Sequence, residues 1–189
     1  MNKGVKDAIE SIKTEYKENP LSFLNEQDIV SHLIGILKDI FPDKVRITSQ
    51  AIKGHRSSTS RVHAEVDIPI RDNQKGRRPK IDIAVFENKD VELKGSRYNN
   101  ITPSCEVDLN DILFGIEVKF YRGVTSQFRP SEIKGLEKTA KKLQRLKGKS
   151  ILLIFVHSYI KDNAIKILDT IFTGLNVEVI TSEVWNKEQ

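Results

Sequence analysis

Cysteine is almost absent from this chain, which has one, Cys105, among its 189 residues. A single cysteine excludes an internal disulfide and any zinc site built from several thiolates. It lies in a polar stretch without a neighbouring histidine, so we interpret it as an incidental thiol. Long apolar runs are also lacking, because the longest, residues 151–157, is far short of the roughly 20 residues that span a bilayer. The sequence therefore predicts no membrane partner.

The N-terminus has no apolar segment of the kind found in secretory signals, which favours a cytoplasmic protein. Internal repeats and low-complexity tracts are missing as well. With 38% hydrophobic residues the chain can bury its own core, which excludes wholesale disorder. We expect a single domain over residues 1–189, with an N-terminal helical extension over 1–20 and a polar insertion over 87–110.

Basic residues outnumber acidic ones by 31 to 26, and the excess is concentrated in two segments. Residues 122–149 hold nine basic and two acidic side chains, and residues 71–80 hold five and one. A charged helix face is usually only solvated, but both segments flank the strands discussed below, which favours contact with nucleic-acid phosphates. The candidate nucleic-acid contacts are Arg77, Arg78, Lys134, Lys138, Lys141 and Lys142.

Apolar periodicity changes repeatedly between helical and strand spacing along the chain. Helices are predicted over residues 5–16 (mostly solvated), 25–40, 131–146 and 162–172, with Asn25 and Ser131 as N-caps. Strands are predicted over residues 45–52, 62–70, 81–86, 91–93, 112–121, 151–156 and 177–180, with polar turns over 53–60 and 72–76. This order predicts an α/β domain with a mixed central sheet flanked by helices.

Two charged residues, Glu117 and Lys119, interrupt an otherwise apolar strand. Strand periodicity places both side chains on one face, with their aliphatic neighbours on the other. Charges inside a strand are costly unless they are paired or bound to a ligand. Asp82 poses the same question in the 81–86 strand. If these two strands are neighbours, the carboxylates of Asp82 and Glu117 converge with Lys119.

Two carboxylates and a lysine suit metal-assisted hydrolysis of a phosphodiester. Carboxylates are ligands for Mg²⁺, and lysine offsets the charge that develops on phosphate. The acid-x-Lys spacing by itself is weak, since it occurs five times in the chain. Only Glu117 and Lys119 carry it within an apolar strand. The alternative interpretation is an ion pair on a solvated sheet face or a charged edge strand.

Several segments between about residues 25 and 156 resemble the PD-(D/E)xK nuclease superfamily, which has the restriction-endonuclease-like fold. Residues 25–30 (NEQDIV) look like its first core helix, and residues 63–70 like its first core strand. Residues 78–85 (RPKIDIAV) resemble the strand that bears the metal-binding aspartate. Residues 115–120 (GIEVKF) resemble the Glu-x-Lys strand, and residues 131–146 the basic helix that follows it. The resemblance implies an αβββαβ core.

By this resemblance Asp82 and Glu117 would bind Mg²⁺ or Mn²⁺, helped by the backbone carbonyl of Val118. Lys119 would stabilise the transition state or position the attacking water, and Glu26 would hold a metal-bound water or a second ion. Pro79 stands three residues before Asp82 rather than directly before it. Asp67 is therefore a competing candidate for the metal-binding aspartate.

The expected function is that of a metal-dependent endonuclease, which hydrolyses double-stranded DNA with a metal-activated water. A homodimer is expected by resemblance, because cutting two strands needs two sites. Three alternatives remain open: a catalytically silent nucleic-acid-binding module, a subunit that acts only with a partner protein in a defence or repair complex, and an RNA-directed nuclease. The sequence does not choose among roles for residues 87–110 as a recognition insertion, a dimer arm or a loop.

Overall fold

A computed structural model describes residues 1–49, 56–68, 79–95, 105–122, 128–157 and 160–181. Its helices are α1 (Lys3–Glu18), α2 (Glu26–Ile40), α3 (Pro130–Gln144) and α4 (Asp162–Ile171), with 3₁₀ turns at Pro20–Ser22 and Leu109–Asp111. Its strands are β1 (Lys44–Ser49), β2 (Arg56–Ser60), β3 (Val62–Asp67), β4 (Lys80–Phe86), β5 (Val91–Gly95), β6 (Cys105–Val107), β7 (Ile112–Tyr121), β8 (Ser150–Val156) and β9 (Asn176–Thr181).

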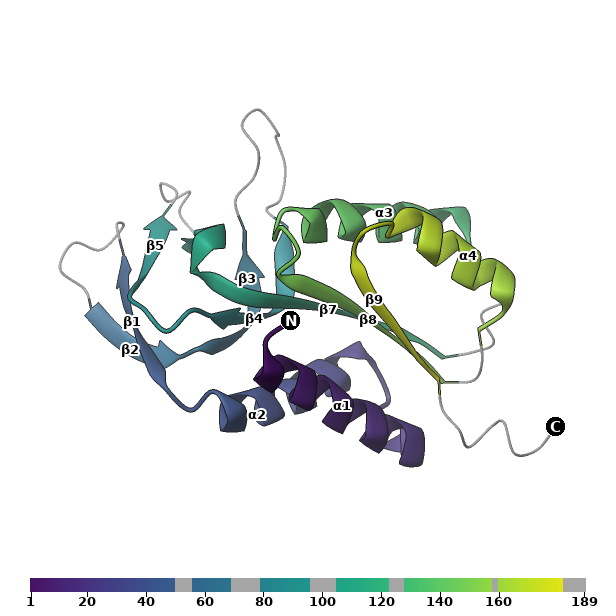
Figure 1. Ribbon diagram of the computed structural model, residues 1–189, viewed down its shortest axis with the longest axis horizontal. Helices are drawn as coiled ribbons and strands as arrows, with labels where there is room; N and C mark the ends of the chain where they lie inside the picture. Colours follow the sequence, from purple (N-terminus) through teal and green to yellow (C-terminus); the bar gives the residue numbers. More distant parts are fainter. Residues whose placement is uncertain (50–55, 69–78, 96–104, 123–127, 158–159, 182–189) are drawn as a thin grey trace.

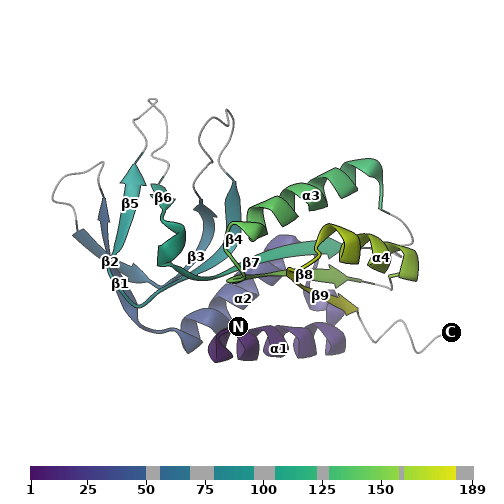
Figure 2. The same cartoon turned by 45° about the horizontal axis from the view of Figure 1, so that its top comes forward.

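The strands form one mixed sheet in the order β2-β1-β5-β6-β3-β4-β7-β8-β9. Strands β3, β4 and β7 are antiparallel neighbours, whereas β7, β8 and β9 run parallel. Helices α1 and α2 cover one face of the sheet, and α3 and α4 cover the other (Figures 1 and 2). The predicted α/β class, with a mixed central sheet flanked by helices, is therefore confirmed.

Helix α2 begins where the sequence predicts. The side chain of Asn25 accepts hydrogen bonds from the backbone of Gln27 and Asp28, and Asp28 accepts one from the backbone of Asn25 in return. This reciprocal capping satisfies amides at the first turn, which have no partner within the helix. The first turn therefore places Glu26 at a defined position at the start of α2.

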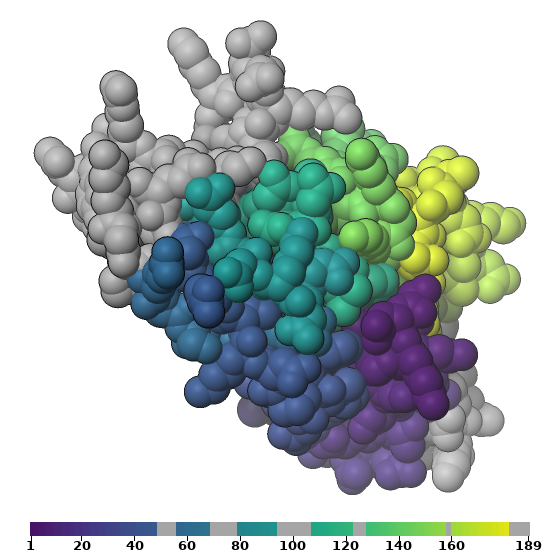
Figure 3. Space-filling model, turned by 60° about the vertical axis from the view of Figure 1, so that its left-hand side comes forward, coloured from purple at the N-terminus to yellow at the C-terminus, as the bar shows by residue number. Residues whose placement is uncertain are grey.

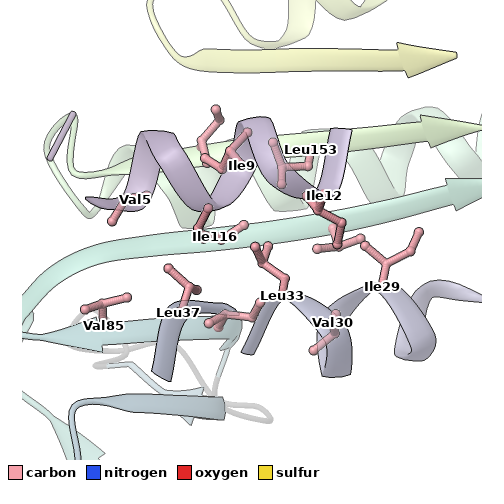
Figure 4. Close-up of a cluster of buried hydrophobic side chains, with 14 of the residues drawn as sticks. Val5, Ile9, Ile12, Ile29, Val30, Leu33, Leu37, Val85, Ile116 and Leu153 are labelled. Atoms are coloured by element: carbon pink, nitrogen blue, oxygen red, sulfur yellow. The ribbon is translucent and has the colours of Figure 1, made fainter. Parts of the chain in front are cut away.

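The apolar stripe of α1 is fully buried, so this helix belongs to the core rather than being the mostly solvated extension that the sequence suggests. Figure 4 shows Ile9 and Ile12 of α1 gathered with Leu33 of α2 over Ile116 of β7. The helix also lies beside the C-terminal part of the sheet (Figure 3), where Lys13 pairs with Glu178 of β9 at 2.7 Å. Because the opposite face of α1 is polar and exposed, the composition of the helix alone does not indicate that it packs in the core.

Strand β8 is buried at every position, as expected for a central strand between two helical layers. The turn that follows α3 approaches the neighbouring β7 at Gly115, where an added Cβ would stand 2.5 Å from Cδ1 of Leu146. The absence of a side chain at Gly115 thus lets the α3 layer pack directly onto the strand that carries Glu117.

Three details of the predicted elements are wrong. Residues 56–60, predicted as part of a turn, form β2, a polar edge strand that pairs only with β1 among the described strands. The N-cap of α3 is Arg129 rather than Ser131, because Pro130 occupies the first turn and Glu132 accepts from the Arg129 amide at 2.6 Å. The 87–110 segment contains the strand predicted at residues 91–93, as β5, but it also contributes β6, which the sequence did not predict. Residues 96–104 and the predicted turn at 72–76 lie outside the described residues.

Candidate active site

The antiparallel pairing of β4 and β7 ends partway along both strands, and two carboxylates lie at that point. The register runs from Phe86 opposite Ile112 to Ile83 opposite Ile116. One step further, the Asp82 amide donates to Glu117 Oε1 at 3.1 Å, and the Val118 amide donates to Asp82 Oδ2 at 2.9 Å. Each carboxylate thus accepts a hydrogen bond from a backbone amide just beyond the last paired residues of the two strands. These hydrogen bonds fix both side chains against the backbone.

The side-chain alternation of β4 also breaks here. Ile83 packs in the core formed with α1 and α2, whereas Ile81 packs with Val66 and Leu146 in a second cluster. In a regular strand, residues two apart face the same side. Asp82 therefore lies at a local distortion of its strand, beside Glu117.

Glu117 is the most deeply buried acidic residue among the described residues, with a side chain that is 1% exposed. Its Oε1 lies 2.6 Å from Nζ of Lys142, which reaches it from α3. Burial raises the pKa of Glu117 to about 7, and Asp82 adds to the rise, while the ammonium groups of Lys142 and Lys119 oppose it. A cation near this carboxylate is needed to keep it ionised.

Lys119 points toward the other helical layer. Its Nζ lies 3.1 Å from Glu26 Oε1 at the start of α2, and 2.7 Å from the carbonyl oxygen of Val118. Burial lowers the pKa of this ammonium, but the charges of Glu26, Asp82 and Glu117 outweigh that effect, so its pKa lies above the ordinary lysine value. Lys119 is thus a fixed positive charge beside the two carboxylates.

The structure brings together the residues that the sequence singled out for catalysis and metal binding. Asp82, Glu117, Val118, Lys119 and Glu26 are linked by the contacts given above. The competing Asp67 lies one strand further, on β3, where its Cα partner in β4 is Lys80. The geometry therefore joins Asp82, rather than Asp67, to Glu117 through hydrogen bonds.

The lysines predicted to contact nucleic acid divide into two sets. Lys134, Lys138 and Lys141 are exposed along α3. Lys142 is half-buried instead, and it binds Glu117 and the carbonyl oxygen of Lys80 at 2.6 Å. Arg77 and Arg78 lie outside the described residues.

The place of Lys142 in the site was missed by sequence reasoning. The signal that could have found it is its position in the helical repeat. Lys142 follows Thr139 by three residues and precedes Leu143, and both of these are buried. It thus borders the packed face of α3, whereas the preceding lysine, Lys141, has the exposed residues Lys138 and Gln144 three positions before and after it.

The donor set at the end of the β4–β7 ladder fits a hard divalent cation. Asp82 and Glu117 offer carboxylate oxygens, and Val118 offers a carbonyl oxygen. Within the described part of the chain, no three His, Cys, Asp or Glu side chains form a metal-binding group. Mg²⁺ commonly uses only one or two carboxylates and completes its octahedron with waters or substrate phosphate. Asp82, Glu117 and the Val118 carbonyl could therefore hold such an ion, whose remaining ligands would be water and a phosphate oxygen of a substrate.

A scan against protein-family models gives no match, and a search of curated proteins finds no similar sequence. None of the helices among the described residues is long and apolar enough to cross a bilayer.

Proposed function

We propose that this protein is a Mg²⁺- or Mn²⁺-dependent nuclease that hydrolyses phosphodiester bonds of DNA, with its centre at Asp82, Glu117 and Lys119. One observation carries the proposal: the carboxylates of Asp82 and Glu117 each accept a hydrogen bond from a backbone amide of the facing strand, where β4 and β7 part, with Lys119 beside them. A charged cluster in a partly buried strand position is costly to fold. Such a cluster is typical of a site that binds a charged ligand.

The topology supports the finer assignment to a restriction-endonuclease-like fold. The segment α2-β3-β4-β7-α3-β8 has the order αβββαβ, and its four strands are neighbours in the order β3-β4-β7-β8. This is the core that the PD-(D/E)xK resemblance implies, with Asp82 on its second strand and Glu117 and Lys119 on its third. The strands β1, β2, β5 and β6 extend the sheet beyond β3.

Each residue then has a role that follows from its contacts. Asp82, Glu117 and the Val118 carbonyl would hold the metal ion, which when bound polarises the phosphate and lowers the pKa of a coordinated water. Lys119 places a positive charge where negative charge develops on the phosphate, and a preorganised charge of this kind stabilises the transition state. Glu26 holds the Lys119 ammonium in position.

A DNA substrate agrees with the charge distribution on the α3 side of the sheet. The exposed Lys134, Lys138 and Lys141 lie on the same helix that delivers Lys142 to Glu117. Contacts from such lysines to phosphates would hold a duplex against the site without reading its sequence.

Cleavage of supercoiled plasmid at low salt, with Mg²⁺, Mn²⁺ or EDTA, tests the proposal. We expect wild type to cut with either metal and not with EDTA. Lys119→Met should lower the rate by about a hundredfold or more, because a charge aimed at the transition state is removed. Lys89→Met is the matched control, since Lys89 stands in another acid-x-Lys sequence and pairs with Asp111 away from the site.

Cutting that survives Lys119→Met, or is lost equally in Lys89→Met, would contradict the proposed centre. Salt-sensitive DNA binding by a wild-type chain that never cuts would favour a catalytically silent module. Cutting that appears only with a partner protein would favour the subunit alternative, and cutting of RNA alone would identify an RNA-directed enzyme.

A further inference from the structure

Two lysine ammonium groups lie on the oxygens that the proposed function assigns to the metal. Lys119 contacts the Val118 carbonyl at 2.7 Å, and Lys142 contacts Glu117 Oε1 at 2.6 Å. Lys119 is also held by Glu26, so its charge has a second partner. Among the carboxylates of the described residues, Lys142 contacts Glu117 alone, so its charge is paired with a carboxylate that is assigned to the metal.

The position of Lys142 is set by its helix rather than by chance orientation of a surface side chain. Its neighbour Leu143 is fully buried between α3 and the sheet. Its Nζ donates to the Lys80 carbonyl as well as to Glu117, so it bridges β4 and β7 at the point where their ladder ends. The Lys142 side chain is only 16% exposed, and its charge is poorly screened by solvent.

We infer that Lys142 is a built-in counter-cation that competes with a divalent ion for Glu117, and that it thereby sets the affinity of the site for metal. The inference rests on the proposed function, because it takes Glu117 as a metal ligand. Glu117 Oε1 already accepts from the Asp82 amide and from Lys142. A divalent ion that binds this carboxylate must share or displace the ammonium, and its charge repels that ammonium at short range.

The same contact explains how the chain folds around a buried carboxylate. A buried charge without a partner costs several kcal/mol, whereas one that is paired and hydrogen-bonded is tolerated. Lysine suits exchange with an ion, because its ammonium is a compact charge on a flexible stem. The site would therefore be stable before metal binds, at the expense of its metal affinity.

Titration calorimetry with Mn²⁺ on purified full-length protein, prepared with EDTA and then freed of it, tests the inference without relying on cleavage. Lys142→Met keeps the apolar stem and removes the charge. At a pH where Glu117 is ionised in both proteins, we expect it to bind Mn²⁺ about tenfold more tightly than wild type, or better, because a competing charge is gone. Lys141→Met is the matched control on the exposed face of the same helix, and we expect its affinity to stay within about threefold of wild type, since solvent screens its charge.

Lys142→Arg provides a second test that does not remove the charge. Its planar fork should hold the carboxylate at least as firmly as lysine does, so we expect Mn²⁺ to bind no more tightly than to wild type. Circular dichroism checks that each variant is folded.

Equal or weaker Mn²⁺ binding by a folded Lys142→Met, with wild type binding normally, would overturn the inference and leave the nuclease proposal standing. Tighter binding by Lys142→Arg would also overturn it. Failure of wild type and all variants to bind Mn²⁺ would instead overturn the proposed function, so the two failures are distinguishable.

Discussion

Glu117 combines three properties that rarely occur together in a residue without a special role: it lies in the middle of a strand, its side chain is buried, and it is charged at high pH. Its neighbours show how the fold accommodates it, with an amide from β4 and an ammonium from α3 on the same oxygen. Burial is the largest influence on the pKa of Glu117 and raises it to about 7. The free energy of unfolding should therefore depend on pH through the titration of this residue.

The pKa of Glu117 is higher in the folded chain than its ordinary value of 4.5, so the folded state binds its proton more tightly than the unfolded state does. Its contribution to stability is therefore complete below pH 4.5 and is lost as the pH rises through about 7. In EDTA, wild type should lose stability relative to Glu117→Gln by on the order of 3 kcal/mol over this range. Urea unfolding from pH 4 to pH 8.5 measures the difference.

Glu137→Gln serves as the control for that series, because Glu137 is exposed on α3. Its stability should run parallel to that of wild type at all pH values. A constant difference between wild type and Glu117→Gln across the range would show that Glu117 titrates normally and would contradict the burial argument.

Helix α3 has two roles in the proposed site, one for each side of the helix. Its inner border presents Lys142 to Glu117, and its outer face carries Lys134, Lys138 and Lys141. Helix α2 lies on the opposite face of the sheet (Figure 1). It supplies Glu26, whose carboxylate pairs with Lys119. The site is thus closed by one helix from each layer, and both meet it where the β4–β7 ladder ends.

If the outer face of α3 contacts phosphates, changing Lys134, Lys138 and Lys141 together to Gln should weaken DNA binding and its salt dependence. The slope of the logarithm of the DNA-binding constant against the logarithm of salt concentration is negative. It should become shallower by about three, since each phosphate contact contributes about 0.9 to its magnitude. Fluorescence anisotropy with a labelled duplex over a range of salt concentrations measures this slope in EDTA, where no cleavage interferes.

The control variant changes Lys3, Lys6 and Lys44 together to Gln. These lysines are exposed on α1 and at the start of β1, so the variant loses the same three charges at a different surface. This variant should keep the wild-type slope. An equal fall in both variants would mean that net charge alone governs binding, and it would remove α3 from the proposed interface.

Across the whole molecule, most of the fold could be predicted from sequence because its core strands have distinctive patterns. The uninterrupted apolar run over residues 151–156 in β8 and the charged interruptions of β7 are both local signals. The convergence of Asp82 with Glu117 followed from assuming that their strands are neighbours, as they are. Local sequence patterns were therefore enough to predict those elements in which burial of one or both faces determines where apolar residues stand.

The features that escaped prediction depend on long-range contacts or on weak local patterns. The polar strand β2 forms because β1 offers it a partner edge, and its Arg-Ser-Ser-Thr-Ser sequence has no apolar period. The docking of α1 beside β9 joins opposite ends of the chain. The spacing within α3 places Lys142 at the border of the packed face, but its contact with Glu117 also depends on how α3 lies over the sheet.

We propose that the metal-binding aspartate is Asp82, which is joined to Glu117 at the end of the β4–β7 ladder. Asp82→Asn and Asp67→Asn, compared in the same Mn²⁺-dependent plasmid cleavage assay, test it most directly. Each change removes one carboxylate charge while keeping an oxygen that can accept a hydrogen bond. We expect Asp82→Asn to lose about a hundredfold or more in rate and Asp67→Asn to cut like wild type. Loss of cutting in Asp67→Asn with Asp82→Asn still active would contradict the account.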